Sequence, residues 1–184
     1  MSMPSWQNSL RARLAKFPHP KVAILGIGHE LRGDDAAGVI VARELQELSS
    51  SGSHARTLQA DVTRAWEPAP LIIEAGAAPE AFTGQLRRFM PDLVIMLDAA
   101  QMDQPPGTIR AIEWQDALGL SASTHTLPLS VIAQYLVSEL GCDITIIGIQ
   151  PAANEFDTPL SSQVRRATDE VTLSLAALLT AISA

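Results

Sequence analysis

Apolar residues occur along the chain in two patterns: short continuous runs, and longer stretches in which they recur every three or four positions. Continuous runs bounded by turn residues are typical of buried strands, whereas the longer period is typical of helices that pack on a core. The runs predict strands at residues 22–27, 71–74, 93–98 and 144–149, with a weaker strand at 108–112. The longer period predicts helices at residues 36–48, 82–90, 128–140 and 161–182.

The alternation of strands and helices predicts an α/β fold, in which helices flank a twisted, mostly parallel sheet in a single three-layer domain. Residues 1–184 contain no internal repeat and no convincing domain boundary. Residues 1–20 form an N-terminal extension ahead of the first strand, and the serine-rich residues 49–70 predict a surface insertion. We expect both segments to be solvent-exposed additions to the domain.

Composition narrows the possible classes of function. Of the 184 residues, 47% are apolar and 18% charged, as in globular proteins, and the net charge of −7 argues against a nucleic-acid partner. The single cysteine, Cys142, excludes an internal disulfide and a multi-cysteine zinc site, and its apolar surroundings predict a buried thiol. Because no segment reads as a secretory signal or a membrane span, we expect a cytoplasmic protein without membrane insertion.

Several chemically active side chains follow the predicted strands. In parallel α/β sheets, ligands bind at the carboxyl ends of the strands. Asp34 and Asp35 come after the first strand, Glu74 ends the second and Asp98 ends the third. His125 stands just before the helix predicted at 128–140. We therefore expect these residues to gather at one edge of the sheet.

The glycine loop after the first strand also invites a dinucleotide-binding interpretation. Gly26 and Gly28 match the opening of the G-x-G-x-x-G fingerprint, but Leu31 occupies the position of its third glycine. Asp34 and Asp35 open the following helix, where their negative charges would repel a pyrophosphate. A nucleotide-dependent oxidoreductase is therefore disfavoured.

Each of the candidate residues also has a structural explanation. One aspartate can cap the helix, but one cap does not require two carboxylates, so we assign that role to Asp34 and leave Asp35 for the cleft. Asp98 can bond loop amides, and His125 can be a half-buried imidazole whose hydrogen bonds are satisfied. Their joint placement favours function, because two carboxylates and an imidazole suit a divalent transition metal such as zinc or nickel. Three protein ligands also leave positions open for water or substrate.

Six motifs in a fixed order carry a resemblance to a known family. They read GIGHELRGDDAAG (26–38), EAGAAPE (74–80), LDAA (97–100), PGTIR (106–110), STHTLPL (123–129) and GIQP (148–151). Each motif alone is weak, but their order and spacing together are specific. From about residue 22 to the end of the last predicted helix, the chain resembles the hydrogenase maturation proteases, closest to the branch that serves formate-hydrogenlyase-type hydrogenases.

The resemblance implies a monomeric α/β endopeptidase that removes the C-terminal tail from the large-subunit precursor of a [NiFe] hydrogenase. The precursor already carries nickel, which the protease recognises near the scissile bond, so no organic cofactor is implied; a divalent transition metal at the site is also compatible. Carried over position by position, the metal-contacting residues fall on Asp35, Asp98 and His125, with Asp35 and Asp98 as the catalytic pair. The alternative is a non-catalytic nickel carrier or sensor that uses the same residues.

Two chemistries of cleavage are compatible with these residues. A metal can polarise the carbonyl or activate a bound water, or Asp35 or Asp98 can act as general base; we favour water attack assisted by a carboxylate. A proton shared between the two carboxylates, as in pepsin, is less attractive because a metal holds a carboxylate ionised. His29 stands where the family usually has asparagine, and it can preserve a hydrogen bond, serve as an auxiliary ligand or be a surface variation. Glu74, where aspartate is common, is the second auxiliary candidate.

Overall fold

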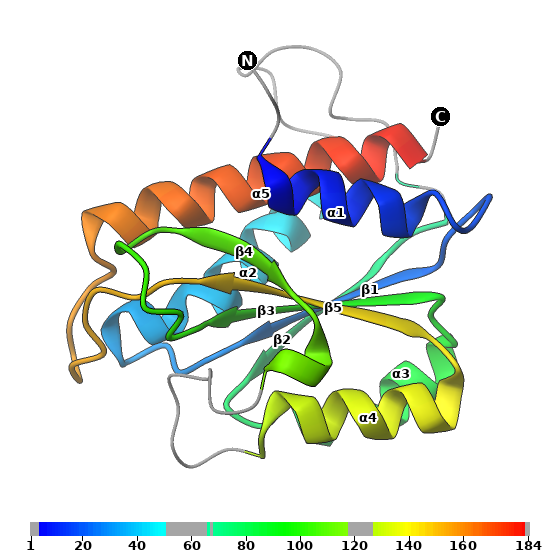
Figure 1. Ribbon diagram of the computed structural model, residues 1–184, viewed down its shortest axis with the longest axis horizontal. Helices are drawn as coiled ribbons and strands as arrows, with labels where there is room; N and C mark the ends of the chain where they lie inside the picture. The colour runs from blue at the N-terminus through cyan, green and yellow to red at the C-terminus, as the bar shows by residue number, and fades with distance from the viewer. Residues whose placement is uncertain (1–3, 51–65, 67, 118–126, 183–184) are drawn as a thin grey trace.

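The centre of the protein is a five-stranded sheet (Figure 1), in a computed structural model that describes residues 4–50, 66, 68–117 and 127–182. The strands follow the order β2-β1-β3-β5-β4. Four of them are parallel, and β4 runs antiparallel to β5 at one edge. Their bounds are Val22–Ile27 (β1), Leu71–Gly76 (β2), Leu93–Ala99 (β3), Ile109–Ile112 (β4) and Asp143–Ile149 (β5).

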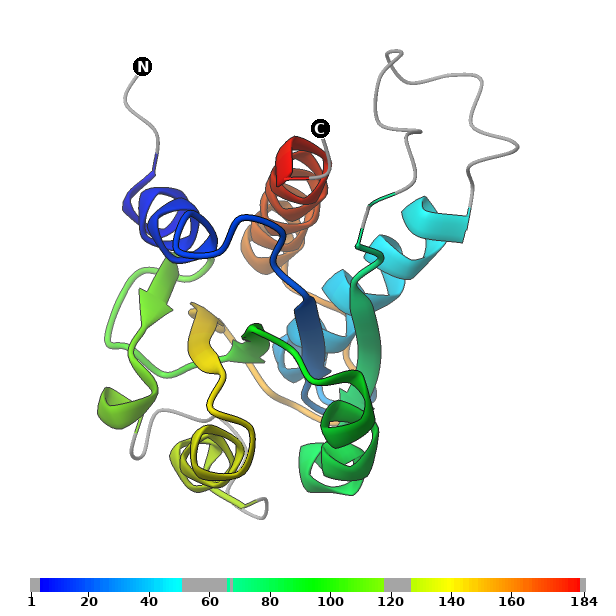
Figure 2. The ribbon, with the colours of Figure 1, turned by 90° about the vertical axis from the view of Figure 1, so that its right-hand side faces the viewer.

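Helices cover both faces of the sheet, which gives the molecule three layers (Figure 2). The helices α1, α2 and α5 lie on one face, and α3 and α4 lie on the other. Their bounds are Ser5–Leu14 (α1), Ala37–Ser50 (α2), Thr83–Phe89 (α3), Leu129–Leu140 (α4) and Ser162–Ile182 (α5). Three short 3-10 helices are η1 (Gly33–Ala36), η2 (Pro79–Phe82) and η3 (Trp114–Asp116). Within the described residues, every helix is too short or too polar to cross a membrane.

Each face of the sheet has its own apolar core, because successive side chains of a strand point to opposite faces. Ile24 of β1 packs into the core under α1, α2 and α5, whereas its neighbours Ala23 and Leu25 belong to the core under α3 and α4. The central strands β1 and β3 are buried along their whole length, so both read as continuous apolar runs. The predicted α/β fold with a mostly parallel sheet is confirmed, and the weak strand predicted at 108–112 is the half-buried edge strand β4.

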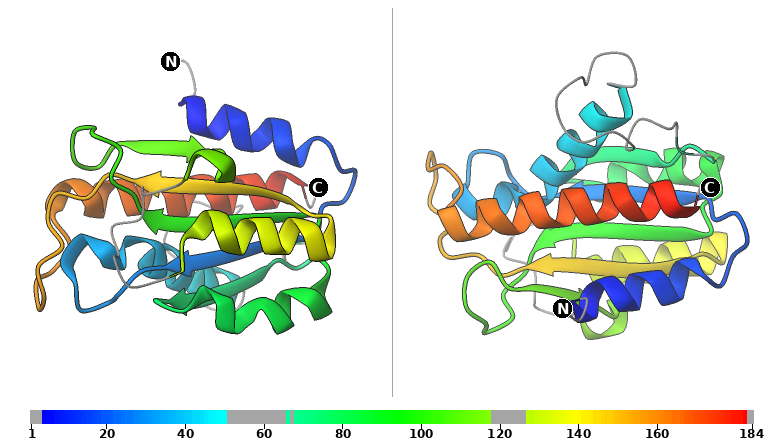
Figure 3. Two further views of the ribbon diagram at one scale, coloured as in Figure 1. Left: turned by 60° about the horizontal axis from the view of Figure 1, so that its bottom comes forward. Right: turned by 90° about the horizontal axis from the view of Figure 1, so that it is seen from above.

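The expectation that the N-terminal extension is a solvent-exposed addition is wrong. Residues Ser5–Leu14 form α1, which lies over the sheet alongside α5 (Figure 3). The helix buries Trp6, Leu10 and Leu14 in the core that it shares with α2 and α5. These three residues are spaced four apart and form a narrow stripe on an otherwise polar helix. The first 20 residues therefore contribute to the core.

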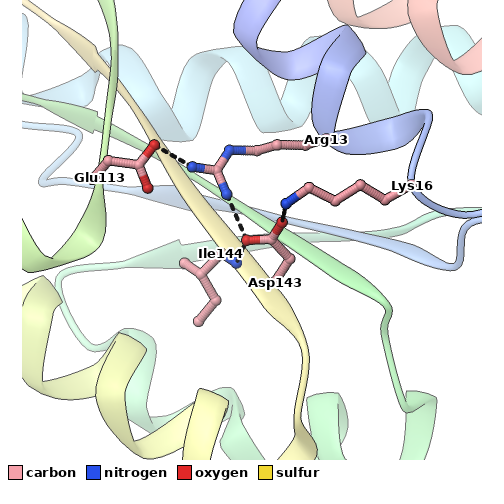
Figure 4. Close-up of polar contacts among 5 residues, drawn as sticks. All are labelled: Arg13, Lys16, Glu113, Asp143 and Ile144. Carbon is pink, nitrogen blue, oxygen red and sulfur yellow. Dashed lines mark hydrogen bonds and ion pairs between the residues drawn. The ribbon is translucent and has the colours of Figure 1, made fainter.

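Ion pairs hold α1 against the sheet (Figure 4). The Arg13 guanidinium donates to Glu113 and, at 2.5 Å, to Asp143 at the start of β5. The Lys16 ammonium lies 2.6 Å from the second oxygen of Asp143, whose first oxygen also accepts the Ile144 N–H at 2.9 Å. The side chain of Arg13 is only 11% exposed, so water screens its ion pairs less than it screens that of the exposed Lys16. Arg13 is therefore the main polar link between the extension and the sheet.

The surface insertion expected at residues 49–70 is described only near its ends. Ser49 and Ser50 continue α2, and residues 51–65 and 67 lie outside the described part of the chain. Trp66 is buried, and its indole N–H donates to the Thr180 hydroxyl of α5 at 3.1 Å. Close to its return to β2, the segment is thus packed on the core.

Candidate active site

The carboxyl ends of β1 and β3 mark the point where the chain reverses its direction of winding. From β1 the chain passes through α2 on one face to β2, and before β5 it passes through α4 on the opposite face. Connections that leave to opposite faces open a crevice between the strand ends, and ligands bind there in α/β sheets. Asp35 follows β1 in η1, and Asp98 is the penultimate residue of β3. Both acids therefore flank this crevice. The carboxyl ends of β1 and β3 are at the left-hand end of the sheet in Figure 1.

Two glycines bring the Asp35 segment close to the strand ends. A Cβ added to Gly38 would lie 2.1 Å from the carbonyl oxygen of Leu97 and 2.5 Å from that of Ile27. Gly28 has a φ of +132°, and a Cβ there would lie 1.7 Å from the carbonyl oxygen of Asp35. Only glycine fits such contacts, so these positions serve the close approach of backbone to backbone.

The amides of the glycine loop are already engaged inside the protein. A phosphate-binding loop needs several free N–H groups that point at the ligand. Here six of the N–H groups of the loop bond to other protein atoms, which disfavours the nucleotide interpretation. The bonds run from Gly28 to the Gly76 carbonyl (3.1 Å), His29 to the Asp35 carboxylate (3.1 Å), Leu31 to His29 Nδ1 (3.2 Å), Arg32 to the His29 carbonyl (3.0 Å), Asp34 to the Ala153 carbonyl (3.1 Å) and Asp35 to the Arg32 carbonyl (3.0 Å).

Asp34 is a structural residue, as expected, but it does not cap its own helix. Its carboxylate accepts the N–H groups of Ala152 at 2.8 Å, Ala153 at 3.1 Å and Ser161 at 2.7 Å. Ser161 directly precedes α5, so Asp34 serves the start of α5 and the loop that leads to it. The side chain is 1% exposed. A buried carboxylate that accepts several backbone amides fixes two segments that are far apart in the sequence.

The two carboxylate oxygens of Asp35 differ: one is held by a hydrogen bond, and the other is open, without a hydrogen-bond partner among the described residues. Its Oδ2 accepts the His29 N–H at 3.1 Å, whereas within the described part of the chain its buried Oδ1 has no hydrogen-bond partner. Burial raises the pKa of Asp35, and the His29 N–H and the charge of Arg32 partly oppose that shift. An unpaired buried oxygen is costly for stability and is typical of a functional site. Oδ1 is thus available to a metal ion, a water molecule or a substrate.

Asp98 and His125 differ in how far the structure describes them. Asp98 is 2% exposed and lies opposite Gly148 in the register of β3 and β5. The 3-10 helix that carries Asp35 contacts β3, so the two acids come from adjoining segments. His125 lies outside the described residues, and within the described ranges no group of three histidine, cysteine or acidic side chains is arranged to hold a metal. The assignment of His125 as a ligand stays a prediction.

His29 lies beside Asp35 and bonds to it through the backbone. Its ring Nδ1 accepts the Leu31 N–H at 3.2 Å, so in the neutral ring the proton is on Nε2. In this state neither ring nitrogen has a free lone pair for a metal, which disfavours the auxiliary-ligand role. The ring also meets Phe156 edge-on, with 6.4 Å between the centroids. His29 instead contributes an N–H donor and a ring that pairs with the ring of Phe156.

Glu74 is part of an ion-pair cluster at the end of β2. Its Oε2 accepts the Arg43 Nε at 2.9 Å and the Arg43 Nη2 at 2.6 Å, and Arg43 also binds Glu30 in the glycine loop. The hydrogen bonds that Arg43 donates to Glu74 and to Glu30 raise the pKa of Arg43 further above its ordinary value. Arg43 therefore joins α2, β2 and the loop before Asp35. This cluster gives Glu74 a structural partner beside the site.

Comparison with known proteins decides the family. The sequence profile of the HycI hydrogenase maturation proteases matches residues 56–177. The chain is 34% identical to a Methanocaldococcus jannaschii protein whose name places it in the same family, over 84% of this chain and 86% of that one. The chain belongs to the hydrogenase maturation proteases.

Further relatives agree with this assignment. The identity to the hydrogenase 3 maturation protease of Escherichia coli K12 is 26%, over 80% of this chain and 84% of that one. The crystal structure of a [NiFe] hydrogenase maturation protease HycI from Thermococcus kodakarensis KOD1 superposes with a TM-score of 0.75 at 30% identity. That superposition covers 93% of this chain and 98% of the other. The fold and the resemblance inferred from the six motifs are confirmed.

Sequence reasoning on this maturation protease missed three features of the site. Phe156, which contacts His29, lies in a loop that carries no motif. Arg43 faces outward on α2, where a charged side chain is unremarkable until Glu74 is brought beside it. The backbone amides that bind Asp34 have no sequence signature, because every residue except proline carries one. All three depend on contacts between segments far apart in the chain.

Proposed function

We propose that this maturation protease cleaves the large-subunit precursor of a [NiFe] hydrogenase and removes a C-terminal tail. Family membership supports a peptide-bond hydrolase, and the Thermococcus kodakarensis relative is described as acting in [NiFe] hydrogenase maturation. The observation that carries the proposal is Asp35: a buried carboxylate with one open oxygen, beside the crevice at the ends of β1 and β3.

In this proposal Asp35 acts as the general base. Its Oδ2 is fixed by the His29 N–H, so Oδ1 is the atom that accepts a proton. Burial raises the pKa of Asp35, which makes it a stronger base than an exposed aspartate. Oδ1 takes a proton from water as the water oxygen attacks the peptide carbonyl carbon. The same proton then passes to the amide nitrogen as the C–N bond breaks.

The nickel ion in the proposal belongs to the substrate. Asp35, Asp98 and His125 would contact it, because carboxylate and imidazole donors suit divalent nickel. Bound nickel would polarise the neighbouring peptide carbonyl. The burial of Asp35 and Asp98 fits such a metal-contacting pair, and in this proposal Oδ1 of Asp35 is kept for the proton. The same donors would accept another divalent metal, such as zinc, in place of the substrate's nickel.

The decisive experiment is cleavage of the purified precursor, with and without nickel, followed by intact-mass spectrometry. We expect loss of one defined C-terminal peptide, and only from the nickel-loaded form. Asp35→Asn removes the base but keeps the shape of the side chain, so it should abolish the mass change. An intact nickel-loaded precursor that binds the wild-type protein through these residues would instead favour a nickel carrier or sensor.

We further propose that the protein works as a cytoplasmic monomer. A precursor that must receive its metal before cleavage is processed in the compartment where the metal is inserted. Size-exclusion chromatography with light scattering tests the oligomeric state. A stable dimer would overturn that part of the proposal.

A further inference from the structure

Two large apolar side chains are exposed on the loops beside Asp35. Leu31, in the loop after β1, is 53% exposed, and Phe156, in the loop after β5, is 67% exposed. Single exposed apolar residues are common on protein surfaces, so exposure alone carries no function. What distinguishes this pair is its position and the way in which it is held. Both loops leave the sheet at the carboxyl ends of its parallel strands (Figure 3). Asp35 and Asp98 lie at the same strand ends.

The two loops are joined to each other by direct contacts. The Asp157 N–H donates to the carbonyl oxygen of Leu31 at 2.7 Å. The Phe156 ring meets the His29 ring at a centroid distance of 6.4 Å and an interplanar angle of 61°. The apolar pair therefore straddles one junction between the loops.

The loop that carries Phe156 is also fixed at both of its ends. Asp34 accepts N–H groups from Ala152 and Ala153 before Phe156, and from Ser161 after it. The phenyl ring thus projects from a backbone segment that is held by partly buried hydrogen bonds to Asp34. A backbone that is fixed before binding loses little conformational entropy when its side chain meets a partner.

His29 links the apolar pair to the catalytic carboxylate. Its N–H binds Asp35 Oδ2, its ring nitrogen accepts the Leu31 N–H, and its ring forms an edge-type pair with the Phe156 ring. Leu31, through its backbone, and Phe156, through its ring, therefore each contact the residue that binds Asp35. A peptide whose scissile bond reaches Asp35 Oδ1 would carry its neighbouring residues across this junction.

The charges around the junction are of both signs. Glu155 and Asp157 are exposed on the loop after β5, whereas Glu30 is paired with Arg43 and Arg32 lies on the loop after β1. The exposed leucine and phenylalanine are therefore the feature that selects a partner, because an apolar side chain would gain from covering them.

We propose that Leu31 and Phe156 form a specificity subsite that receives an apolar side chain of the precursor, next to the bond that is cleaved. This inference rests on the proposed function, because it assigns a residue class to the same substrate. It goes beyond it by naming the two side chains that select the sequence around the cut.

The test compares KM and kcat for Leu31→Ala, Phe156→Ala and Phe156→Leu on the nickel-loaded precursor. An apolar subsite that binds ground state and transition state equally changes KM and leaves kcat unchanged. We expect Phe156→Ala to raise KM by about tenfold, Leu31→Ala to raise it by a smaller factor, and Phe156→Leu to stay close to wild type. Leu173→Ala on α5 is the matched control, since Leu173 is 68% exposed on another surface, and it should leave KM unchanged.

Substitutions in the precursor identify the occupant. Apolar residues on either side of the cut are replaced one at a time by aspartate, and each precursor is tested with wild-type and Phe156→Ala protease. The residue that occupies the subsite is the one whose replacement raises KM for the wild type but adds little in Phe156→Ala.

Unchanged KM in both Leu31→Ala and Phe156→Ala would overturn the subsite while leaving the proposed function intact. Equal falls in kcat for Phe156→Ala and for the Phe156→Leu variant would also overturn it, because they would indicate a disturbed Asp35. A wild-type protein that leaves the nickel-loaded precursor uncut would overturn the proposed function itself.

Discussion

Asp34 and Asp35 are neighbours of identical chemistry whose surroundings give them different roles. Asp34 meets three backbone N–H groups from the segment before α5, and Asp35 meets one N–H from the glycine loop. The first carboxylate is therefore satisfied and structural, and the second keeps an open oxygen. Substitution of Asp34 should therefore lower the stability of the fold, whereas substitution of Asp35 should abolish cleavage without lowering stability.

For Asp34→Ala we expect a loss of about 2 kcal/mol in the free energy of unfolding, roughly twice the cost of losing a single helix cap. Three amides lose their acceptor, although Ala152 and Ala153 are exposed enough for water to replace part of the loss. Urea denaturation measures the change. Asp157→Asn is the control in the same loop and should stay within about 0.5 kcal/mol of wild type. An equally stable Asp34→Ala would show that these three bonds do not hold the loop.

For Asp35→Asn we expect a higher melting temperature together with the loss of cleavage. The raised pKa of Asp35 means that the fold disfavours its ionised form, so the buried charge lowers stability above the pKa of the unfolded aspartate. That penalty grows as the pH rises through the folded pKa and is absent at lower pH, where both states are protonated. The neutral amide carries no such penalty. Differential scanning calorimetry at pH 7 tests the sign, and a lower melting temperature would contradict it.

Cys142 gives a further prediction at the scale of one side chain. It is 5% exposed, its thiol donates to the Leu136 carbonyl at 3.8 Å, and burial raises the pKa of the thiol to about 11. Because the thiolate is the reactive form, alkylation of the folded protein at pH 8 should be very slow. The same reagent should label urea-unfolded protein readily. Rapid labelling of the folded form, followed by mass spectrometry, would show that the α4–β5 region opens easily.

At the scale of elements, the N-terminal helix is the clearest case in which packing decides the role. The stripe of α1 is one residue wide per turn, yet it places a tryptophan and two leucines in the core. The ion pairs of Arg13 fasten the same helix to β5 and to the segment after β4. The extension, which was expected to be a solvent-exposed addition, is therefore part of the domain.

Leu10→Ala should lower the free energy of unfolding by about 2–5 kcal/mol, the range for deleting a buried leucine side chain. Leu10 is 1% exposed. Arg11→Ala, on the exposed side of the same helix, should change stability by no more than about 0.5 kcal/mol. Chemical denaturation of both variants makes the comparison. Equal effects would mean that α1 contributes through charge and not through burial.

At the scale of the whole molecule, the fold places a ligand crevice where the connections of β1 and β3 diverge, and many α/β proteins bind nucleotides there. In this protease six N–H groups of the glycine loop form internal hydrogen bonds, and two carboxylates lie beside them. The architecture is shared with nucleotide-binding proteins, but most of the loop donors that would bind a phosphate are engaged.

Nucleotides should therefore leave the melting temperature unchanged. A ligand that binds only the folded state raises that temperature by mass action, so thermal shift assays with NAD and ATP provide the measurement. A reproducible increase of several degrees would contradict the conclusion that the N–H groups of the loop are engaged inside the protein.

Local patterns along the chain were sufficient to predict much of this protein. The continuous apolar runs of β1 and β3 fixed two central strands, since a strand buried on both faces excludes polar residues. Strand ends followed by Asp35 and Asp98 indicated the functional edge, because parallel strands share one carboxyl end. The order of the six motifs gave the family. His125, outside the described residues, is still known only from its motif.

Only the tertiary structure decided which residues complete the site. Asp34 binds amides 118 to 127 positions away, and Phe156 reaches His29 across a similar span of chain. The spacing of apolar residues predicts which side of each helix or strand is buried, but it does not say which loops meet after these elements pack. The sequence by itself therefore determined the strands, the family and the acids of the edge. The packing of β1 beside β3, and of the two loops above them, determined which aspartate is held and which is open.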